Sequence, residues 1–296
     1  GAAAPAASTA RRQIEGRTRI RYSKAKTKPG ETRSVPATPA LASPAVASSK
    51  RGVGAIVDLG TFSGPGLAPR RARAYVPSRG AGKRSVLVMF DGQNVFGDEG
   101  SFAGGWHAHE TVERMAAARA PVILAIDHGG AERIAELGAP SSPKLAAFVD
   151  LVVDQVLPAA HARFALAYGP AAHVVCGSSM GGLAALYMHF RRPEVFGGAI
   201  AMSPSLWFGR RGIFDFVARE PNPYRSRVWL DAGAREAGGR LATSVEAMSR
   251  ALRDRGWAAG AAGDLRVAFH VDARGRHDEA SWRRRLPKAL RFAFAP

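Results

Sequence analysis

The sequence contains a single cysteine, Cys176, among its 296 residues. This excludes an internal disulfide framework and any zinc site built from several cysteines. Cys176 itself ends an apolar run, where a small buried hydrophobe is expected rather than a reactive thiol. No uninterrupted apolar run approaches the roughly 20 residues of a membrane-spanning helix, so no transmembrane segment is predicted. Because 46% of the residues are hydrophobic, the chain can bury a large core without such cross-links.

Acidic residues are also scarce: 24 Asp and Glu stand against 42 Lys and Arg, which gives a formal net charge of +18. Half of this surplus lies in residues 1–51, which contain eleven Lys or Arg and two Glu. That segment is rich in Ala, Pro, Ser and Thr and has no apolar period, which predicts a disordered extension. A basic tail can bind polyanions. This one lacks aromatic interleaving beyond Tyr22 and any nucleic-acid motif, so nucleic acid is not the expected partner.

The opening residues, Gly1 to Ser8, resemble the region around a signal-peptide cleavage site. This pattern favours an exported protein, periplasmic or secreted. A trimmed chain would begin in the same way, and a cytoplasmic location is the alternative.

From about residue 52, short apolar runs alternate with helical patterns, as in an α/β domain with a mostly parallel sheet. The predicted strands are Val53–Asp58, Arg71–Val76, Val86–Phe90, Val122–Ile126, His173–Cys176, Ala199–Met202, Val228–Leu230 and Leu265–Val271. The predicted helices are Ala108–Ala118, Lys144–Leu157, Met180–Phe190, Gly212–Ala218, Leu241–Arg255 and Glu279–Phe294, with Pro158 and Pro193 ending two of them. The first two strands alternate in polarity and favour an antiparallel edge. Residues 52–296 therefore form one predicted domain, with about eight strands and helices on both faces.

The most specific local pattern is Gly177-Ser178-Ser179-Met180-Gly181, a Gly-x-Ser-x-Gly sequence between a strand-like run and a helical one. This placement is typical of a nucleophile elbow, in which the central serine has a strained backbone. The flanking glycines have no Cβ to collide in so tight a turn. Ser179 is therefore the predicted nucleophile of an α/β-hydrolase fold, at a helix start that favours developing negative charge. In an ordinary turn, Ser179 would only cap the helix.

In this fold the acid and the histidine follow the serine in chain order, each on a loop after a strand. His277 lies in a Gly/Arg loop before the last helix, as a triad base requires, whereas His270 lies inside the last predicted strand. Asp231 and Glu236 both follow the preceding strand, and either could hold the imidazole. Glu236 is preferred because it lies further along the loop and could reach His277.

An oxyanion hole needs the N–H of the residue after the nucleophile, here Met180, and a second N–H from the loop after the third strand. That loop is Asp91-Gly92-Gln93-Asn94-Val95-Phe96, and the N–H of Gly92 or Gln93 is the expected second donor. Gly92 would also let backbone come close to a substrate. No alternating carboxylates follow Asp91, so no metal is predicted, and the reaction implies no cofactor.

Four blocks of sequence form a recognisable set. They are Asp91 to Phe96 with Trp106, Gly177 to Gly182, Ser203-Pro204-Ser205-Leu206-Trp207, and His277 to Trp282. Together they resemble the putative-esterase family of α/β-hydrolases, which includes enterochelin-esterase-like hydrolases, feruloyl esterases, S-formylglutathione hydrolases and mycobacterial mycolyltransferases. The resemblance covers about residues 60–296. It implies a triad of Ser179, Glu236 and His277.

The resemblance also implies that Met180 and Gln93 provide the backbone donors. Gln93 is preferred because in the mycolyltransferases the residue two after the Asp of an Asp-Gly pair supplies this N–H. Trp207 matches a position that often lines the pocket, although an aromatic there could instead belong to the core. Gly92, Trp106 and His128 are the other candidates for substrate binding.

Related members read the segment that begins at Ile126 as Asn-Gly, then Arg, then Glu-Tyr. His128 and Leu137 depart from that pattern, so the relatives' substrates are not carried over to this chain.

The predicted function is serine carboxylester hydrolysis through an acyl-enzyme, on a small-molecule or glycan-linked ester. Three alternatives stay open. The same triad would serve an acyltransferase in which an alcohol outcompetes water, and a hydrolase fold can also serve a non-catalytic binding protein. The third is a polyanion-binding protein dominated by the basic tail. The sequence fixes neither the ester nor the oligomeric state.

Overall fold

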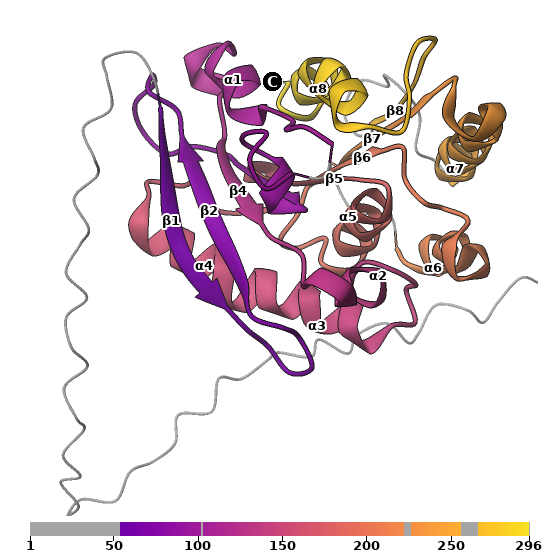
Figure 1. Ribbon diagram of the computed structural model, residues 1–296, viewed down its shortest axis with the longest axis horizontal. Coiled ribbons are helices and arrows are strands. Elements are labelled where there is room, and N and C mark those ends of the chain that lie inside the picture. The colour runs from indigo at the N-terminus through magenta and orange to yellow at the C-terminus, as the bar shows by residue number, and fades with distance from the viewer. Residues whose placement is uncertain (1–53, 102, 222–225, 256–265, 296) are drawn as a thin grey trace, which may run out of the picture. The chain divides into compact units, whose positions relative to one another are not determined.

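The computed structural model describes residues 54–101, 103–221, 226–255 and 266–295. The predicted extension over residues 1–51 lies outside this part of the chain, as do Val53 and Leu265, the predicted first residues of two strands. The described residues form one eight-stranded sheet covered by helices, as Figure 1 shows. This is the mostly parallel α/β architecture that the sequence predicts.

The sheet combines an antiparallel edge with a parallel body. Its strands are β1 (Ala55–Phe62), β2 (Arg70–Val76), β3 (Val86–Phe90), β4 (Val122–Ile126), β5 (His173–Ser178), β6 (Gly198–Met202), β7 (Arg227–Gly233) and β8 (Arg266–Asp272). Their order across the sheet is β1-β2-β4-β3-β5-β6-β7-β8. The β1–β2 and β2–β4 pairs are antiparallel, whereas the pairs from β4 to β8 are parallel. The predicted antiparallel edge is confirmed.

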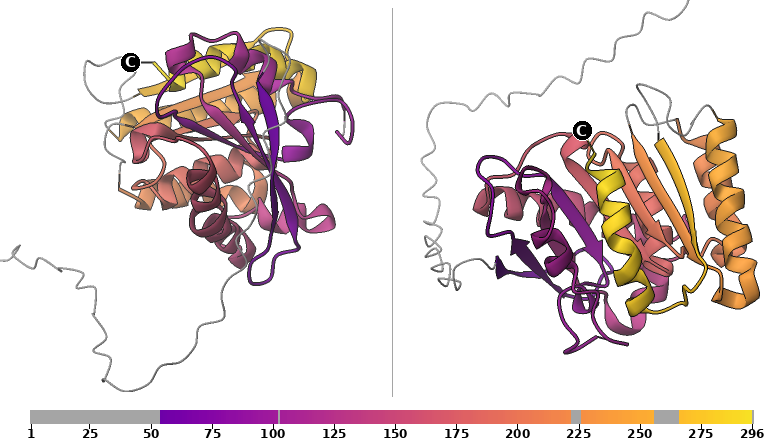
Figure 2. Two further views of the ribbon diagram at one scale, coloured as in Figure 1. Left: turned by 90° about the vertical axis from the view of Figure 1, so that its left-hand side faces the viewer. Right: turned by 90° about the horizontal axis from the view of Figure 1, so that it is seen from above.

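Helices cover both faces because successive residues of a strand point to opposite sides of the sheet. On β3, Val86 and Val88 join one apolar cluster, whereas Leu87 and Met89 join the other. The first cluster packs against α3 (Pro143–Leu151), α4 (Leu157–Arg163), α5 (Met180–Arg191), α6 (Gly212–Arg219) and α7 (Arg240–Asp254), and the second against α1 (Ala108–Glu113) and α8 (Glu279–Ala293). Figure 2 shows α8 and α7 on opposite sides of the sheet. The short α2 (Arg133–Glu136) precedes α3.

Pro158 does not end a helix, contrary to the prediction. A π-helical turn over Val152–Val156 joins α3 to α4, and Pro158 is the second residue of α4. Proline normally breaks a helix because it lacks an N–H and its ring meets the carbonyl four residues earlier. In the wider π turn, the N–H of Leu157 bonds to the carbonyl of Val152, five residues back, which leaves room for the ring. Pro193 does follow the end of α5, as predicted.

The continuous helical stretch Pro143–Arg163 is 21 residues long and apolar enough, by length and composition, to cross a membrane. Its apolar side chains, including Leu145, Phe148 and Val152, are instead buried in the cluster beneath the sheet. This stretch is therefore a core helix of the domain.

The helix α1 is shorter than predicted and ends at Glu113.

The strands β5 to β8 lie next to one another and run in the same direction, so their carboxyl ends share one edge of the sheet. In parallel α/β sheets this edge is where ligands bind. The loops that leave it carry the sequence-predicted serine, acid and histidine.

Candidate active site

Ser179 joins β5 to α5 in a strained turn. Its backbone has φ 56° and ψ −120°, outside the regions that side-chain-bearing residues normally occupy. A Cβ on Gly177 would lie 2.4 Å from the backbone carbonyl of Gly181, so the turn requires glycine at this position. The N–H of Ser179 donates to the carbonyl of Met202 on β6 at 3.0 Å. Strand, turn and helix thus have the arrangement predicted for a nucleophile elbow.

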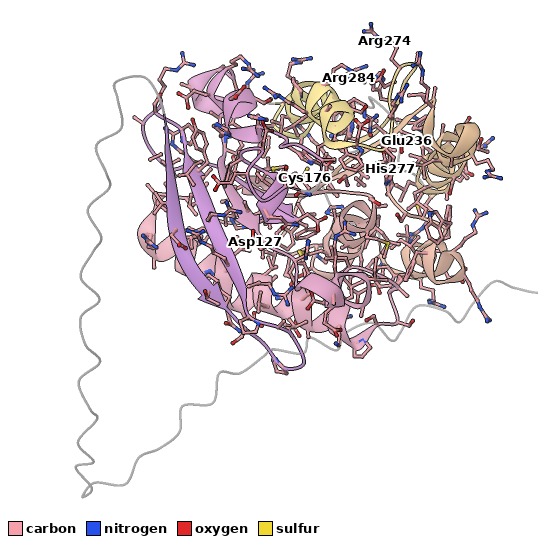
Figure 3. The ribbon with its side chains drawn as sticks, viewed as in Figure 1. Asp127, Cys176, Glu236, Arg274, His277 and Arg284 are labelled. Atoms are coloured by element: carbon pink, nitrogen blue, oxygen red, sulfur yellow. The ribbon has the colours of Figure 1, made fainter. Side chains whose placement is uncertain are left out.

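Three side chains from distant loops form a continuous hydrogen-bonded chain. The Oγ of Ser179 lies 2.9 Å from Nε2 of His277, and Nδ1 of His277 lies 2.7 Å from Oε2 of Glu236. The imidazole is partly exposed, whereas the carboxylate is almost fully buried, with 1% of its side chain accessible. Figure 3 shows Glu236 and His277 side by side. The structure therefore brings together the serine, histidine and acid that the sequence singled out.

The charged form of Glu236 is stabilised by hydrogen bonds. Burial alone would raise the pKa of this carboxyl group. The hydrogen bonds from His277, the hydroxyl of Ser203 and the N–H of Gly233 outweigh burial and hold the pKa below its usual value. A carboxylate that stays ionised next to a ring nitrogen fixes the tautomer in which the other nitrogen can accept a proton.

Asp231, the alternative acid, lies in a separate part of the same buried region. Its carboxylate accepts from the indole N–H of Trp229 at 2.8 Å and lies 3.1 Å from a guanidinium nitrogen of Arg285. Burial raises the pKa of Asp231 to about 6, although Arg285 and Trp229 act in the opposite direction. The contact to His277 is made by Glu236. His270 lies on β8 and contacts Lys288, which fits its predicted place inside a strand.

The loop after β3 is held to α2 by an ion pair and lies against the elbow. Gly92–Asn94 forms a single 3-10 turn, and the carboxylate of Asp91 just before it receives two hydrogen bonds from Arg133, at 2.6 and 2.8 Å. A Cβ on Gly181 would lie 3.2 Å from Oδ2 of Asp91, so this loop touches the first turn of α5. Gln93 and Met180 therefore lie on neighbouring segments.

Gly92 has a structural reason to be glycine. A Cβ there would lie 2.7 Å from the backbone of Ile126 at the end of β4. The missing side chain thus leaves room for β4.

An open pocket of about 570 Å³ adjoins this hydrogen-bonded chain. It is lined by Ser179, Glu236 and His277 and by Ser205, Trp207, Ala237, Arg240, Leu241 and Ser244. Trp207 is 63% exposed, so it is a wall of this pocket and not a core aromatic.

Two of the predicted substrate-binding residues are placed elsewhere. Trp106 is 4% exposed and packs against Trp282 in the core, with ring centroids 5.7 Å apart, because α8 covers it. His128 accepts from the N–H of Gly130 in its own loop and does not line the pocket next to Ser179. The prediction for Trp106 is therefore wrong, and that for His128 has no support from this pocket.

Three further residues contact this hydrogen-bonded chain or lie next to it, and the sequence assigned none of them a role. The hydroxyl of Ser203 contacts Glu236, the hydroxyl of Ser205 lies 3.3 Å from that of Ser179, and Arg285 lies among the buried carboxylates. The sequence offered one signal, the Ser203-Pro204-Ser205 run directly after a strand. Nothing in the sequence set Arg285 apart from the other arginines of an Arg-rich chain.

Within the described ranges, the thiol is buried and no cluster of side chains forms a metal site. Cys176 is fully buried, and burial raises the pKa of its thiol. No group of three or more His, Cys, Asp or Glu side chains in those ranges could hold a metal ion.

Comparison with known proteins places this geometry in context. A curated relative, the iron(III) enterobactin esterase of Dickeya dadantii (strain 3937), is 33% identical over 139 residues, which is 47% of this chain and 30% of the relative. The chain thus spans less than a third of the length of that relative.

Solved structures share the fold at low sequence identity. The BES protein from Bacillus cereus superposes with a TM-score of 0.65 at 18% identity, covering 81% of this chain and 95% of the other. The siderophore hydrolase EstB from Aspergillus nidulans gives a TM-score of 0.62 at 18% identity, covering 85% and 97%. The enterobactin esterase FES from Shigella flexneri gives 0.61 at 22% identity, covering 79% and 58%. These likenesses establish the α/β-hydrolase fold.

Residues 68–293 match the protein-family model described as "Putative esterase". This match covers most of the chain, and it includes the elbow, the acid loop and the histidine loop. The chain belongs to the Putative esterase family.

Proposed function

We propose that this protein hydrolyses carboxylic esters through an acyl-enzyme formed on Ser179. The observation that carries the proposal is the hydrogen-bonded chain from Ser179 through His277 to Glu236, with links of 2.9 and 2.7 Å. A nucleophile within hydrogen-bond reach of a base that is itself oriented by a third group is the arrangement that activates a serine. Membership of an esterase family supports the same reaction.

The reaction proceeds in two halves. Ser179 Oγ attacks the ester carbonyl carbon while Nε2 of His277 takes the hydroxyl proton. The tetrahedral intermediate then collapses, the bond to the alcohol oxygen breaks, and His277 returns the proton to the departing alcohol. Water attacks the acyl-enzyme by the same route, with His277 as base, and releases the acid. Glu236 holds the ring and stabilises the imidazolium that forms in each half.

Two backbone N–H groups stabilise the oxyanion in this proposal, those of Met180 and Gln93. Met180 is the first residue of α5, so its N–H has no partner within the helix and points toward the helix start. The contact between Asp91 and the first turn of α5 brings the Gln93 segment next to it. Loss of one such donor typically costs about 3–4 kcal/mol of transition-state stabilisation.

The proposed substrate is a small-molecule ester. A pocket of about 570 Å³ with an exposed indole accepts a group of drug-like size and favours one with an apolar or aromatic face. Structural neighbours include a siderophore hydrolase, a ferulic acid esterase, and an enterobactin esterase whose structure was determined in the presence of enterobactin. A panel of siderophore, feruloyl, acetyl-sugar and simple acyl esters would rank these classes by kcat/KM.

The nucleophile is tested by replacing it. We expect Ser179→Ala to reduce kcat on an activated aryl ester by roughly 10⁴–10⁶-fold while the thermal unfolding midpoint stays near that of the wild type. Ser63→Ala, which removes an exposed serine that does not line the pocket, is the control and should keep activity near that of the wild type. Near wild-type turnover by Ser179→Ala would contradict the proposed function.

A further inference from the structure

The loop after β6 lies between the nucleophile and the acid. Because β6 pairs with β5 on one side and β7 on the other, the segment Ser203–Ser205 leaves the sheet between the elbow and the acid loop. The N–H of Ser205 donates to the carbonyl of Ser179 at 2.9 Å, whereas the N–H of Ser203 donates to the carbonyl of Asp231 at 2.9 Å. One short loop thus contacts both the elbow and the carboxyl end of β7, where the acid loop begins.

Ser203 has a backbone conformation that side-chain-bearing residues adopt rarely. Its φ is 44°, in the left-handed region, and the residue is fully buried. A non-glycine residue in that region carries a conformational cost, which persists only where the surroundings impose it. Glycine would avoid the cost, but it would also remove the hydroxyl.

The hydroxyl of Ser203 makes three hydrogen bonds, and their directions follow from the chemistry of the partners. It lies 2.7 Å from Oε1 of Glu236, 2.7 Å from Nη2 of Arg285 and 3.0 Å from Nε1 of Trp282. Guanidinium and indole nitrogens only donate, so they occupy the two lone pairs of the hydroxyl. Its single proton must therefore point at Glu236.

The hydrogen bond from Ser203 gives the two carboxylate oxygens of Glu236 different partners. Oε1 accepts from the Ser203 hydroxyl and from the N–H of Gly233, both at 2.7 Å. Oε2 is left facing Nδ1 of His277. The plane of the carboxylate is thus set by donors on the side opposite the imidazole.

The Ser203 hydroxyl also connects Glu236 to Trp282, whose ring packs against His277. The ring of Trp282 meets that of His277 edge-on, with centroids 5.1 Å apart, and its indole N–H is held by Ser203. Arg285, on the same helix α8, lies 3.1 Å from Asp231 and 3.6 Å from Glu236, so one guanidinium faces two buried carboxylates. Glu236, Trp282 and Arg285 all contact the hydroxyl of Ser203.

We propose that Ser203 is a positioning residue of the triad: its hydroxyl fixes the carboxylate of Glu236 so that one oxygen remains on His277. The inference rests on the proposed function, because it assigns a role relative to that triad. Ser203 is buried and does not line the pocket next to Ser179, so it acts through Glu236 and Trp282.

The test compares two variants that lack the hydroxyl. We expect Ser203→Ala to lower kcat by about 10–100-fold, because small displacements of a catalytic group are costly. KM should change by less than about twofold, since Ser203 does not line the pocket. Ser203→Gly removes the hydroxyl but relieves the backbone cost, so it should unfold at a higher temperature than Ser203→Ala and still have the low kcat.

A matched control separates positioning from stability. Ser226 is another buried serine, and its hydroxyl bonds to His189 at 2.7 Å. It directly precedes β7, whereas the acid loop follows the other end of that strand. Ser226→Ala should lose a comparable amount of stability and keep kcat within about twofold of the wild type. In proton NMR, the His277 Nδ1 proton should give a downfield signal in the wild type and in Ser226→Ala, and should broaden or vanish in both Ser203 variants.

Each outcome decides the matter. If Ser179→Ala is inactive while both Ser203 variants retain wild-type kcat and the NMR signal, this inference fails and the proposed function stands. If Ser179→Ala is active, the proposed function itself fails. If neither Ser203 variant folds, the hydroxyl is required for the fold rather than for orientation of the acid, which also overturns the inference.

Discussion

Ser179 Oγ and His277 Nε2 lie 2.9 Å apart although 98 positions separate them in the chain. The fold brings them together because β5 and the strands that follow it are parallel neighbours, whose loops emerge at one edge of the sheet. Glu236 reaches His277 by the same route, from the loop after β7. This arrangement makes specific predictions for each loop.

The first prediction distinguishes the two buried carboxylates. Glu236→Gln should reduce kcat by roughly 10³–10⁴-fold, because an amide neither stabilises the imidazolium nor keeps the required tautomer. Asp231→Asn should reduce it by less than about tenfold, since Asp231 contacts Trp229 and Arg285 rather than His277. Steady-state rates on one aryl ester test both. An inverted ranking would make Asp231 the acid.

The second prediction concerns the pH dependence of stability. Burial raises the pKa of Asp231 from 3.8 to about 6, so the folded protein binds a proton there more readily than the unfolded chain. Stability contributed by this group is therefore lost as pH rises through that interval. Relative to the wild type, Asp231→Asn should gain on the order of 2–3 kcal/mol of unfolding free energy between pH 4 and pH 7. If the unfolding free energies of the two proteins, measured by urea unfolding, changed in parallel between pH 4 and pH 7, this prediction would be refuted.

The third prediction concerns the elbow. Gly177→Ala places a Cβ 2.4 Å from the backbone of Gly181, where no flexible side chain can move aside. We expect a loss of at least about 2–3 kcal/mol in the free energy of unfolding, together with most of the activity. Gly97→Ala is the control, because a Cβ at that position has open space around it. Equal stability of the two variants would mean that the turn is looser than described.

The fourth prediction concerns the pocket wall. Trp207→Ala should raise KM for an ester with an aromatic acyl group by about 5–10-fold, the loss of roughly 1 kcal/mol of contact. Stability should be unaffected, because Trp207 is 63% exposed. Tyr168→Ala removes an even more exposed aromatic that does not line the pocket, and should leave KM unchanged. Identical KM values for the two variants would exclude Trp207 as a substrate contact.

Local patterns were sufficient for the strands, for most helices and for the three side chains now found in contact. Continuous apolar runs such as Val86–Phe90 mark strands buried on both faces, and Gly177 and Gly181 mark the tight turn between strand and helix. Chain order then singled out His277 and favoured Glu236, because a loop after each parallel strand returns to the same edge.

Features that depend on packing across the fold were beyond this reasoning. Pro158 resembles a helix end, since the π turn that accommodates it has no sequence signature of its own. The sequence predicted Trp106 as a binding residue, whereas in the fold Trp282 of α8 packs over it. Ser203 and Arg285 lie 82 positions apart, and only the assembled sheet shows that they meet under the acid.

The central claim is that Ser179 carries the acyl group, and a fluorophosphonate probe tests it most directly. Such a probe phosphonylates an activated serine, and intact-protein mass spectrometry followed by peptide mapping locates the added mass. The account predicts one adduct, on Ser179, formed quickly in the wild type, slowly in His277→Ala and not at all in Ser179→Ala. Labelling of another residue, or equal labelling of Ser179 with and without the imidazole of His277, would contradict it.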